Sequence, residues 1–398
     1  MTSLPRAFLS CLLAAPLLVA CAPNGAPAQP SPGTATPADT ADPTPRPMQV
    51  TTIADGLDHP WAVALLPDGG FLVTERPGRL RRISPVGDVS DPIAGVPDVF
   101  AEGQGGLLDV VLAPDFADTR RIYLSYAEPG PGGTAGTAVA HAVLGDGRLT
   151  DVTRIYQQEP KLTGGAHFGS RLAFDGNGHV FISQGERHRR AMAQDLAVLQ
   201  GKLVRLYLDG GIPADNPFVG GGDTRPETWS FGHRNIQGMA FDPRTGVLWA
   251  SEHGPRGGDE LNLPEAGKNY GWPLATFGLE YGTGEPYAET VGTTAPGTTA
   301  PHHYWDVSPG LSGMAFLVGH PGSAWNDSLF LGALAEENLI RLQLDGNRIV
   351  GEERLLGDRD ERIRDVRVGS DGAVYVLTDA ADGTLLRLDA PTRPTAED

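Results

Sequence analysis

The stretch SRLAFDGNGHVFISQ, residues 170–184, decides the fold of this chain. Two runs of alternating apolar residues flank an Asp-Gly turn, which is the pattern of a β-hairpin. The same phrase returns as QGMAFDPRTGVLWAS at residues 237–251. Looser copies follow the same order of apolar run, turn and second run, and they lie at residues 61–76, 107–127, 312–334 and 365–380. Because the copies recur about every 61 residues, the chain is predicted to repeat one β-rich unit six times.

A unit of this length holds about four short strands, which is the size of one propeller blade. Several copies continue into a third β-rich run, as at residues 78–84, 338–346 and 383–389. No segment has a long helical period, and residues 191–203 are expected to hold about one helical turn. We therefore predict an all-β fold, a six-bladed β-propeller of four-stranded antiparallel blades over residues 48–390. Two stacked sandwiches are the alternative, but they give no reason for six similar phrases.

The composition excludes several classes of protein. The 398 residues include 53 Gly and 34 Pro, which break helix interiors and argue against a bundle of long helices. A formal net charge of -18 argues against nucleic acid as a partner. The two cysteines, Cys11 and Cys21, both lie near the N-terminus, so the chain is no disulfide scaffold.

The N-terminal segment has the pattern of an export signal. One Arg precedes an apolar run from Ala7 to Ala20 that is too short for an ordinary membrane span. Residues 18–21, Leu-Val-Ala-Cys, are similar to the bacterial lipobox, in which the Cys is acylated and becomes the mature N-terminus. We predict a lipoprotein signal peptide at residues 1–20 and a lipid anchor on Cys21. An ordinary secretory signal is the alternative.

The flanking segments lack the apolar residues that a core needs. Residues 21–47 are rich in Pro, Ala and Thr and are predicted to form a disordered tether, with a second disordered tail at residues 391–398. The protein is therefore expected at the cell envelope, on the periplasmic side of the membrane or on the outer cell surface.

Two loops carry polar residues suited to catalysis and ligand binding. His167, flanked by glycines in residues 164–169, is a candidate general base because imidazole titrates near physiological pH. Arg234 and Asn235 can grip a carboxylate or a carbonyl oxygen. A structural loop His and a solvated polar turn are the competing interpretations.

Two further segments suggest a metal ion and an anion. Acidic residues, glycines and carbonyls at 252–262 favour a hard cation, calcium before zinc, although acidic turns are common in so negative a chain. Arg362 and Arg364 project to the same side of an extended segment, which suits a ligand with several carboxylates. Salt bridges to the adjacent acids would explain this pair equally well. Gln104 is another loop-borne polar group at the start of a blade.

Several enzyme motifs are missing from the sequence. It contains no dinucleotide-binding GxGxxG between strand and helix, no P-loop, no GxSxG elbow and no HExxH. A nicotinamide Rossmann enzyme and an α/β-type serine hydrolase therefore fit poorly.

Five motifs in order resemble one family. They are His-Phe-Gly-Ser-Arg-Leu, Gly-His-Arg-Asn-Ile-Gln-Gly, Glu-His-Gly-Pro-x-x-x-Asp-Glu-Leu-Asn, Asn-Tyr-Gly-Trp-Pro and Arg-Ile-Arg-Asp-Val, at residues 167–172, 232–238, 252–262, 269–273 and 362–366. From residue 50 to 388 the chain resembles the soluble quinoprotein sugar dehydrogenases, which carry pyrroloquinoline quinone (PQQ), and most of all their periplasmic aldose sugar dehydrogenase branch. The resemblance implies oxidation of an aldose at C1 to the lactone, with electrons passed to an acceptor that the sequence does not identify.

The resemblance also implies a role for individual residues. His167 matches the general base, which takes the proton of the C1 hydroxyl while hydride moves to the quinone. Arg234 matches a residue that stabilises charge on the quinone oxygen. The family's cofactor contacts match Gln104, Arg234, Asn235, Tyr281, Arg362 and Arg364.

The family also binds calcium. The backbone carbonyls of Gly254 and Pro255 match ligands of a calcium ion that touches the cofactor. Glu260 and the carbonyl of Tyr270 match ligands of a second, structural calcium ion. Trp305 is a looser match to an aromatic residue near the cofactor plane.

One cofactor-binding position departs from the family. Ala335 stands where the family usually has a Lys that binds the anionic edge of the cofactor, and Lys161, Lys202 and Lys268 are the only lysines of the chain. The departure keeps two other functions open. One is a binding module without cofactor, and the other is a calcium-dependent lactonase.

Overall fold

The computed structural model describes residues 47–391, all of which belong to one compact unit, Thr44–Asp398. The predicted signal peptide, the lipid anchor on Cys21, the tether up to residue 46 and the tail from residue 392 lie outside the described residues. Among residues 47–391 there are 24 strands and three short helices, α1 (Phe116–Thr119), η1 (Pro131–Gly133) and η2 (Arg190–Ala193). No helix of this described part is long and apolar enough to cross a membrane.

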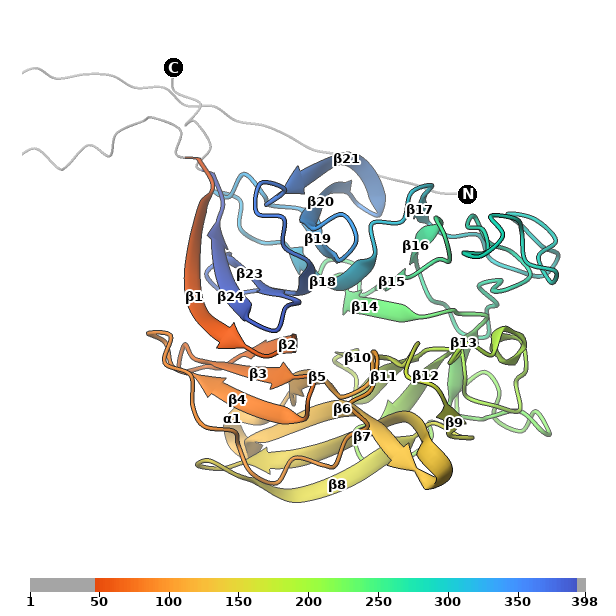
Figure 1. Cartoon of the computed structure of the whole chain (residues 1–398), viewed down its shortest axis with the longest axis horizontal. Coiled ribbons are helices and arrows are strands. Elements are labelled where there is room, and N and C mark those ends of the chain that lie inside the picture. Colours follow the sequence, from red (N-terminus) through yellow and green to blue (C-terminus); the bar gives the residue numbers. More distant parts are fainter. Residues whose placement is uncertain (1–46, 392–398) are drawn as a thin grey trace, which may run out of the picture. The chain divides into compact units, whose positions relative to one another are not determined.

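The strands form six separate antiparallel sheets, which are the blades of a six-bladed β-propeller (Figure 1). The first blade contains β2 (Pro60–Leu65), β3 (Phe71–Glu75) and β4 (Arg79–Ile83). The second blade contains β5 (Leu107–Leu112), β6 (Arg121–Gly130), β7 (Thr134–Leu144), β8 (Leu149–Gln157) and β9 (Leu162–Thr163). The third blade contains β10 (Gly169–Phe174), β11 (His179–Gln184), β12 (Lys202–Tyr207) and β13 (Thr228–Phe231).

The last three blades have four strands each. The fourth blade contains β14 (Ile236–Phe241), β15 (Leu248–Glu252), β16 (Asp259–Asn262) and β17 (His303–Trp305). The fifth contains β18 (Leu311–Leu317), β19 (Ser328–Ala333), β20 (Asn338–Asp345) and β21 (Arg348–Leu355). The sixth contains β22 (Ile363–Val368), β23 (Val374–Thr378), β24 (Gly383–Asp389) and β1 (Gln49–Leu57). The repeated phrases of the sequence are the two inner strands of each blade, and there are six blades, as predicted.

The ring is closed by a strand from the start of the domain. In Figure 1, β1 lies beside β24, and the register pairs Val50 with Leu388. The innermost strands β2, β5, β10, β14, β18 and β22 each contact the next one around the ring, and β22 contacts β2. Closure leaves no blade without two neighbours, so the apolar faces of all six sheets are buried.

Two blades depart from the predicted four strands. The first has three strands, followed only by an isolated bridge between Ile83 and Val89. Pro85, Pro92 and Pro97 follow β4, and proline cannot donate a ladder hydrogen bond. The second blade gains β9, which pairs with the end of β7.

Every innermost strand begins with an irregularity. The register to the second strand shifts between Pro60 and Ala62, and an equivalent shift occurs near the start of β5, β10, β14, β18 and β22. A bulge bends a strand and re-aims the side chains that follow it. All six bulges lie where the innermost strand begins and the second strand ends. This end of the propeller therefore carries six irregular, polar loops around one axis.

A buried charge network ties the innermost strands together. The Arg171 guanidinium donates to Asp109 at 3.2 Å and to Asp365 at 2.9 Å, and Arg367 contacts the same two carboxylates at 3.0 and 3.2 Å. Arg171 also lies over the ring of Trp61, 4.1 Å from its centroid. Both carboxylates accept backbone N–H groups as well, so they are fully engaged in holding β2, β5, β10 and β22 together.

Candidate active site

The loops at the bulged end surround one large cavity of ≈ 850 Å³. It brings together residues that are far apart in the sequence and come from all six blades. Of the residues predicted from the sequence, its wall contains Gln104, Gly254, Pro255, Tyr281, Ala335, Arg362 and Arg364. A cavity of this size accommodates a drug-sized ligand.

One side of the cavity is positively charged because several arginines gather there around a single carboxylate, that of Asp379. Arg364 donates to Asp379 at 2.7 Å and Arg362 contacts the same oxygen at 3.3 Å. Burial alone would raise the pKa of Asp379, but the charge and hydrogen bond of Arg364 outweigh it and lower the pKa to about 2. Arg76, at the end of β3, also lines the cavity and adds to this lowering. On this side of the cavity three guanidiniums lie against one carboxylate, which leaves a local positive charge for an anionic ligand.

His167 lies beside this cavity in a buried pair. Its Nδ1 is 2.8 Å from Oε1 of Glu186, and the side chain of His167 is only 6% exposed. Burial lowers the pKa of His167 to about 4, against the opposing effect of Glu186. Burial by itself would raise the pKa of Glu186, yet the hydrogen bond from His167 and the nearby charges of His167, Arg234 and His188 together outweigh it and lower that pKa. At neutral pH the pair is thus a neutral imidazole bonded through Nδ1–H to a carboxylate, which leaves a lone pair on Nε2.

The loop that carries His167 is held rigidly from two sides. The His167 N–H donates to the Gln104 side chain at 2.8 Å, and the buried Arg187 donates to the carbonyls of Ala166 and Ala135. His167 itself has a left-handed backbone, with φ 55°. A Cβ on Gly185 would lie 1.9 Å from the His167 carbonyl oxygen, so only glycine fits where the two loops cross.

The wall of the cavity includes Phe168 and Gly169, which directly follow His167 in the chain, but it does not include His167, Arg234 or Asn235. Oδ1 of Asn235 accepts the Gly169 N–H at 3.0 Å, and Arg234 donates to the His253 carbonyl at 3.1 Å. The predicted base and these two polar residues therefore lie next to each other at the edge of the cavity.

Several buried donors around the cavity have no partner. Among residues 47–391, Nε of Arg234, Nδ2 of Asn235 and Nε of Arg364 are buried without a hydrogen bond. A buried donor without a partner is costly, and such groups indicate a ligand that would accept from them. Their side chains fit a planar anion with several oxygens.

The predicted first metal site is a turn of exposed carbonyls. Gly254 and Pro255 both line the cavity, and the Gly254 N–H is fixed by a 2.9 Å hydrogen bond to Asp259. The Tyr281 hydroxyl donates to the Pro255 carbonyl at 3.1 Å and is otherwise largely exposed at the rim. Carbonyl oxygens of this kind are ligands that calcium prefers.

The predicted second metal site is a separate small cavity of ≈ 10 Å³, lined by Glu252, Glu260 and Tyr270 among others. That volume suits a single ion or water molecule. Burial raises the pKa of Glu260 to about 8, and the nearby Glu252 charge adds to the shift. Two carboxylates forced together in this way fit a bound cation, which would stabilise both in the ionised form.

Two residues that were predicted to lie near the cofactor, Ala335 and Trp305, offer no polar group to the cavity. Ala335 lies in the cavity wall, where it presents only a methyl group. Trp305 does not line the cavity; its Nε1 donates to Glu352 at 3.1 Å and its ring packs in the core beside Leu311.

Sequence reasoning missed Glu186, Arg76 and Asp379. Each follows the end of the second strand of its blade, after β11, β3 and β23 respectively. That shared position was a usable signal, because Gly254 and Ala335 follow β15 and β19 in the same way.

Comparison with known proteins identifies the class to which this fold and site belong. The family model described as Glucose / Sorbosone dehydrogenase matches residues 57–387, so the chain belongs to that family. It is 52% identical over 347 residues to the aldose sugar dehydrogenase YliI of Escherichia coli, which covers 86% of this chain and 93% of that protein.

Two solved structures extend the comparison. A glucose dehydrogenase crystal structure matches with a TM-score of 0.84 and 58% identity, over 86% of this chain and 99% of the other. The PQQ-bound aldose sugar dehydrogenase of Streptomyces coelicolor matches with a TM-score of 0.69 and 26% identity, over 86% and 98% of the two chains.

Proposed function

We propose that this protein oxidises aldose sugars at C1 to lactones, with PQQ as hydride acceptor and calcium as its partner ion. The observation that carries the proposal is the single cavity whose wall joins Arg362, Arg364 and Gln104 to the Gly254–Pro255 carbonyls, with the His167–Glu186 pair at its edge. The aldose sugar dehydrogenase relatives and the PQQ-bound structure support the same reaction.

The residues of the chain would divide the work. Nε2 of His167 is the unprotonated atom that would take the C1 hydroxyl proton, and Glu186 would hold the ring in the tautomer that allows this. Arg362 and Arg364 would hold the carboxylates of the cofactor, with Gln104, Arg234, Asn235 and Tyr281 as further contacts. When bound, PQQ would supply the quinone that accepts hydride, and calcium would polarise its carbonyl.

The metal sites follow from the same residues. The Gly254 and Pro255 carbonyls would hold the calcium ion that serves the cofactor, once the Tyr281 hydroxyl gives up its bond to Pro255. Glu260 and the Tyr270 carbonyl would hold the structural ion.

The test is reconstitution of the full chain with PQQ and calcium, followed by dye reduction with a panel of aldoses. We expect sugar-dependent reduction that His167→Ala abolishes while PQQ binding, measured by calorimetry, persists. PQQ binding without turnover on any sugar would refute the proposed reaction, and absence of both binding and turnover would refute the whole proposal and favour the binding module without cofactor.

A calcium-dependent lactonase is less well supported. Such an enzyme needs carboxylate ligands on the propeller axis, but Asp109 and Asp365 are paired there with Arg171 and Arg367. Hydrolysis of gluconolactone without PQQ would nevertheless favour it.

We also propose that the protein is exported and anchored through a lipid on Cys21, with its electrons passing to an acceptor at the cell envelope. The lipobox-like residues 18–21 support this. Metabolic labelling with palmitate should label the wild type and not Cys21→Ala; equal labelling of both would contradict the anchor.

A further inference from the structure

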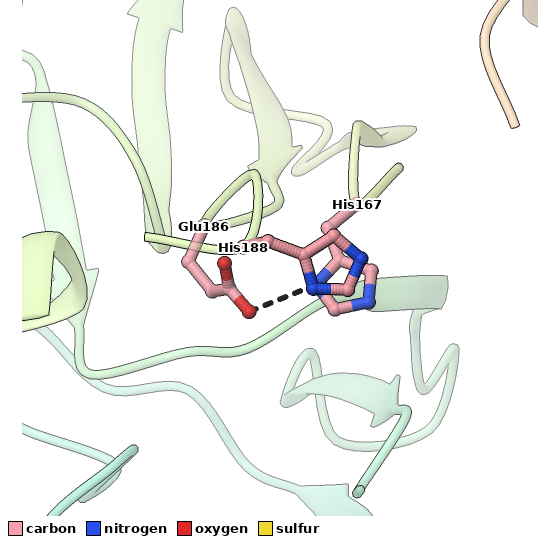
Figure 2. Close-up of side chains that lie close together, drawn as sticks. All are labelled: His167, Glu186 and His188. Atoms are coloured by element: carbon pink, nitrogen blue, oxygen red, sulfur yellow. Dashed lines mark hydrogen bonds and ion pairs between the residues drawn. The ribbon is translucent and has the colours of Figure 1, made fainter. Parts of the chain in front are cut away.

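A second imidazole lies directly against the proposed base. The rings of His167 and His188 are 4.0 Å apart between centroids, and Figure 2 shows both beside the Glu186 carboxylate. His167, Glu186 and His188 each offer one ligand atom, and these three atoms lie within 4.8 Å of one another. Among residues 47–391 this is the only group of three or more His, Cys, Asp or Glu side chains that converges in this way.

We infer that His167, Glu186 and His188 form a binding site for a divalent transition-metal ion such as Zn²⁺. An ion bound to Nδ1 of His167 moves the single proton of the neutral ring to Nε2, and this blocks the base. The metal-binding site does not depend on the proposed function, whereas the inhibition rests on the proposed function. Two imidazoles and one carboxylate are a ligand set that zinc uses in proteins, with the fourth position open.

The geometry needs only a small change to close around an ion. Ligand atoms around a tetrahedral zinc lie about 3.3 Å apart, given bond lengths of about 2.0–2.1 Å. Nδ1 of His167 and Oε1 of Glu186 are already 2.8 Å apart, so the adjustment falls on His188, which is exposed. An ion would reach the buried pair from the side of this exposed ring.

The backbone is shaped to present these side chains. His167, Arg187 and His188 all have left-handed backbones, with φ of 55°, 58° and 56°. Such a conformation costs roughly 1–2 kcal/mol for each non-glycine residue, and clustered strain of this kind is typical of functional sites. Oε2 of Glu186 accepts the Arg189 N–H at 2.8 Å, which directs Oε1 toward His167.

Charge and ligand type set the expected affinity and selectivity. The guanidiniums of Arg187, Arg189 and Arg234 are close enough to affect His188, and they oppose a cation. We therefore expect a dissociation constant on the order of micromolar rather than that of a structural zinc site. Imidazole ligands disfavour calcium, so this site and the Gly254–Pro255 carbonyls would take different ions.

The binding test is calorimetric titration of the cofactor-free full chain with Zn²⁺ alone. His188→Asn removes one ligand and keeps a residue that tolerates a left-handed backbone. We expect the wild type to bind one Zn²⁺ per chain with a dissociation constant on the order of micromolar, and we expect His188→Asn to raise that constant roughly tenfold or more. His320→Asn, a matched change at a partly exposed histidine outside the cluster, should leave this binding unaltered.

Unchanged zinc affinity in His188→Asn, or an equal loss in His320→Asn, would overturn the site. Displacement of Zn²⁺ by millimolar Ca²⁺ would overturn the imidazole ligation.

The inhibition test uses the enzyme reconstituted with PQQ and calcium. Zn²⁺ should inhibit sugar-dependent dye reduction of the wild type, and His188→Asn should need at least about tenfold more Zn²⁺ for the same fractional inhibition of its own zinc-free rate. Equal sensitivity of both would refute the inhibitory role. If no form of the protein oxidises sugars, the proposed function fails, and the calorimetric titration still decides the metal site.

Discussion

Glu186→Gln tests whether the carboxylate behind His167 is required for turnover. The substitution keeps the size and planar shape of the side chain and an oxygen that can accept the Arg189 N–H. It removes the negative charge and replaces Oε1, the oxygen that lies 2.8 Å from Nδ1 of His167, with an amide NH2 group that cannot accept the Nδ1–H. As His167 takes a proton it becomes a buried imidazolium, and Glu186 is the acid that pairs with it.

The magnitude follows from that one contact. A hydrogen bond to a charged group contributes about 1.5–3 kcal/mol. Losing it in the transition state should lower kcat/KM by roughly 10- to 150-fold, since about 1.4 kcal/mol corresponds to a tenfold change. The pKa of His167 is held down to about 4 by burial, and Glu186 opposes that lowering. Without Glu186 the pKa should fall further, so the acid limb of the rate profile should move to lower pH.

The assay is sugar-dependent dye reduction by the reconstituted enzyme between about pH 3.5 and 8, with PQQ affinity measured in parallel. Wild type should stay active well below the ordinary histidine pKa of about 6.5. Glu353→Gln, which alters an exposed partner of Arg341, serves as the matched control and should behave as wild type. A loss of less than about threefold in Glu186→Gln, or an acid limb that moves to higher pH, would refute the reasoning.

Three further predictions concern the cavity and its support. Arg76→Ala should raise the dissociation constant for PQQ roughly tenfold, because it leaves Arg362 and Arg364 alone against Asp379; unchanged affinity by calorimetry would contradict this. Arg171→Met should cost about 3–5 kcal/mol of unfolding free energy in a denaturant titration, because buried carboxylates lose their partner, and a cost below about 1 kcal/mol would be inconsistent with it. Removing calcium with a chelator should weaken PQQ binding, and PQQ affinity that is indifferent to calcium would exclude the carbonyl site.

The propeller was predictable because its signal is local. Each blade contributes one hairpin whose turn residues and alternation are legible in a short window, as at Asp175 and Asp242, and six copies multiply a weak signal. The closing strand β1 was not predicted, because its pairing of Val50 with Leu388 spans the whole domain. The missing strand of the first blade depends on Pro85 and its neighbours, whose effect on pairing emerges only once the sheet is assembled.

The site was predictable where a residue carries its own chemistry. His167 between glycines and the pair of Arg362 and Arg364 stand out in the sequence, and the structure puts them at the same end of the propeller. Glu186 and Asp379 did not stand out, because an acid gains meaning only from the partner that the fold brings to it. In a chain with 49 acidic residues, only their position just after the second strand of a blade separates these two from the rest.

The loss of the family's Lys at Ala335 looks less severe in three dimensions than in the sequence. The acid that follows it, Glu336, pairs with Arg354 at 2.7 Å and does not line the cavity. Arg362 donates to the carbonyl of Leu334 at 2.8 Å, so one guanidinium already lies beside the vacated position. Arg76, which follows β3 in the first blade, adds a second cation to the cavity wall. The positive charge needed for an anionic cofactor is thus carried by arginines on other blades, which is why removing Arg76 should matter here even though Ala335 itself supplies no charge.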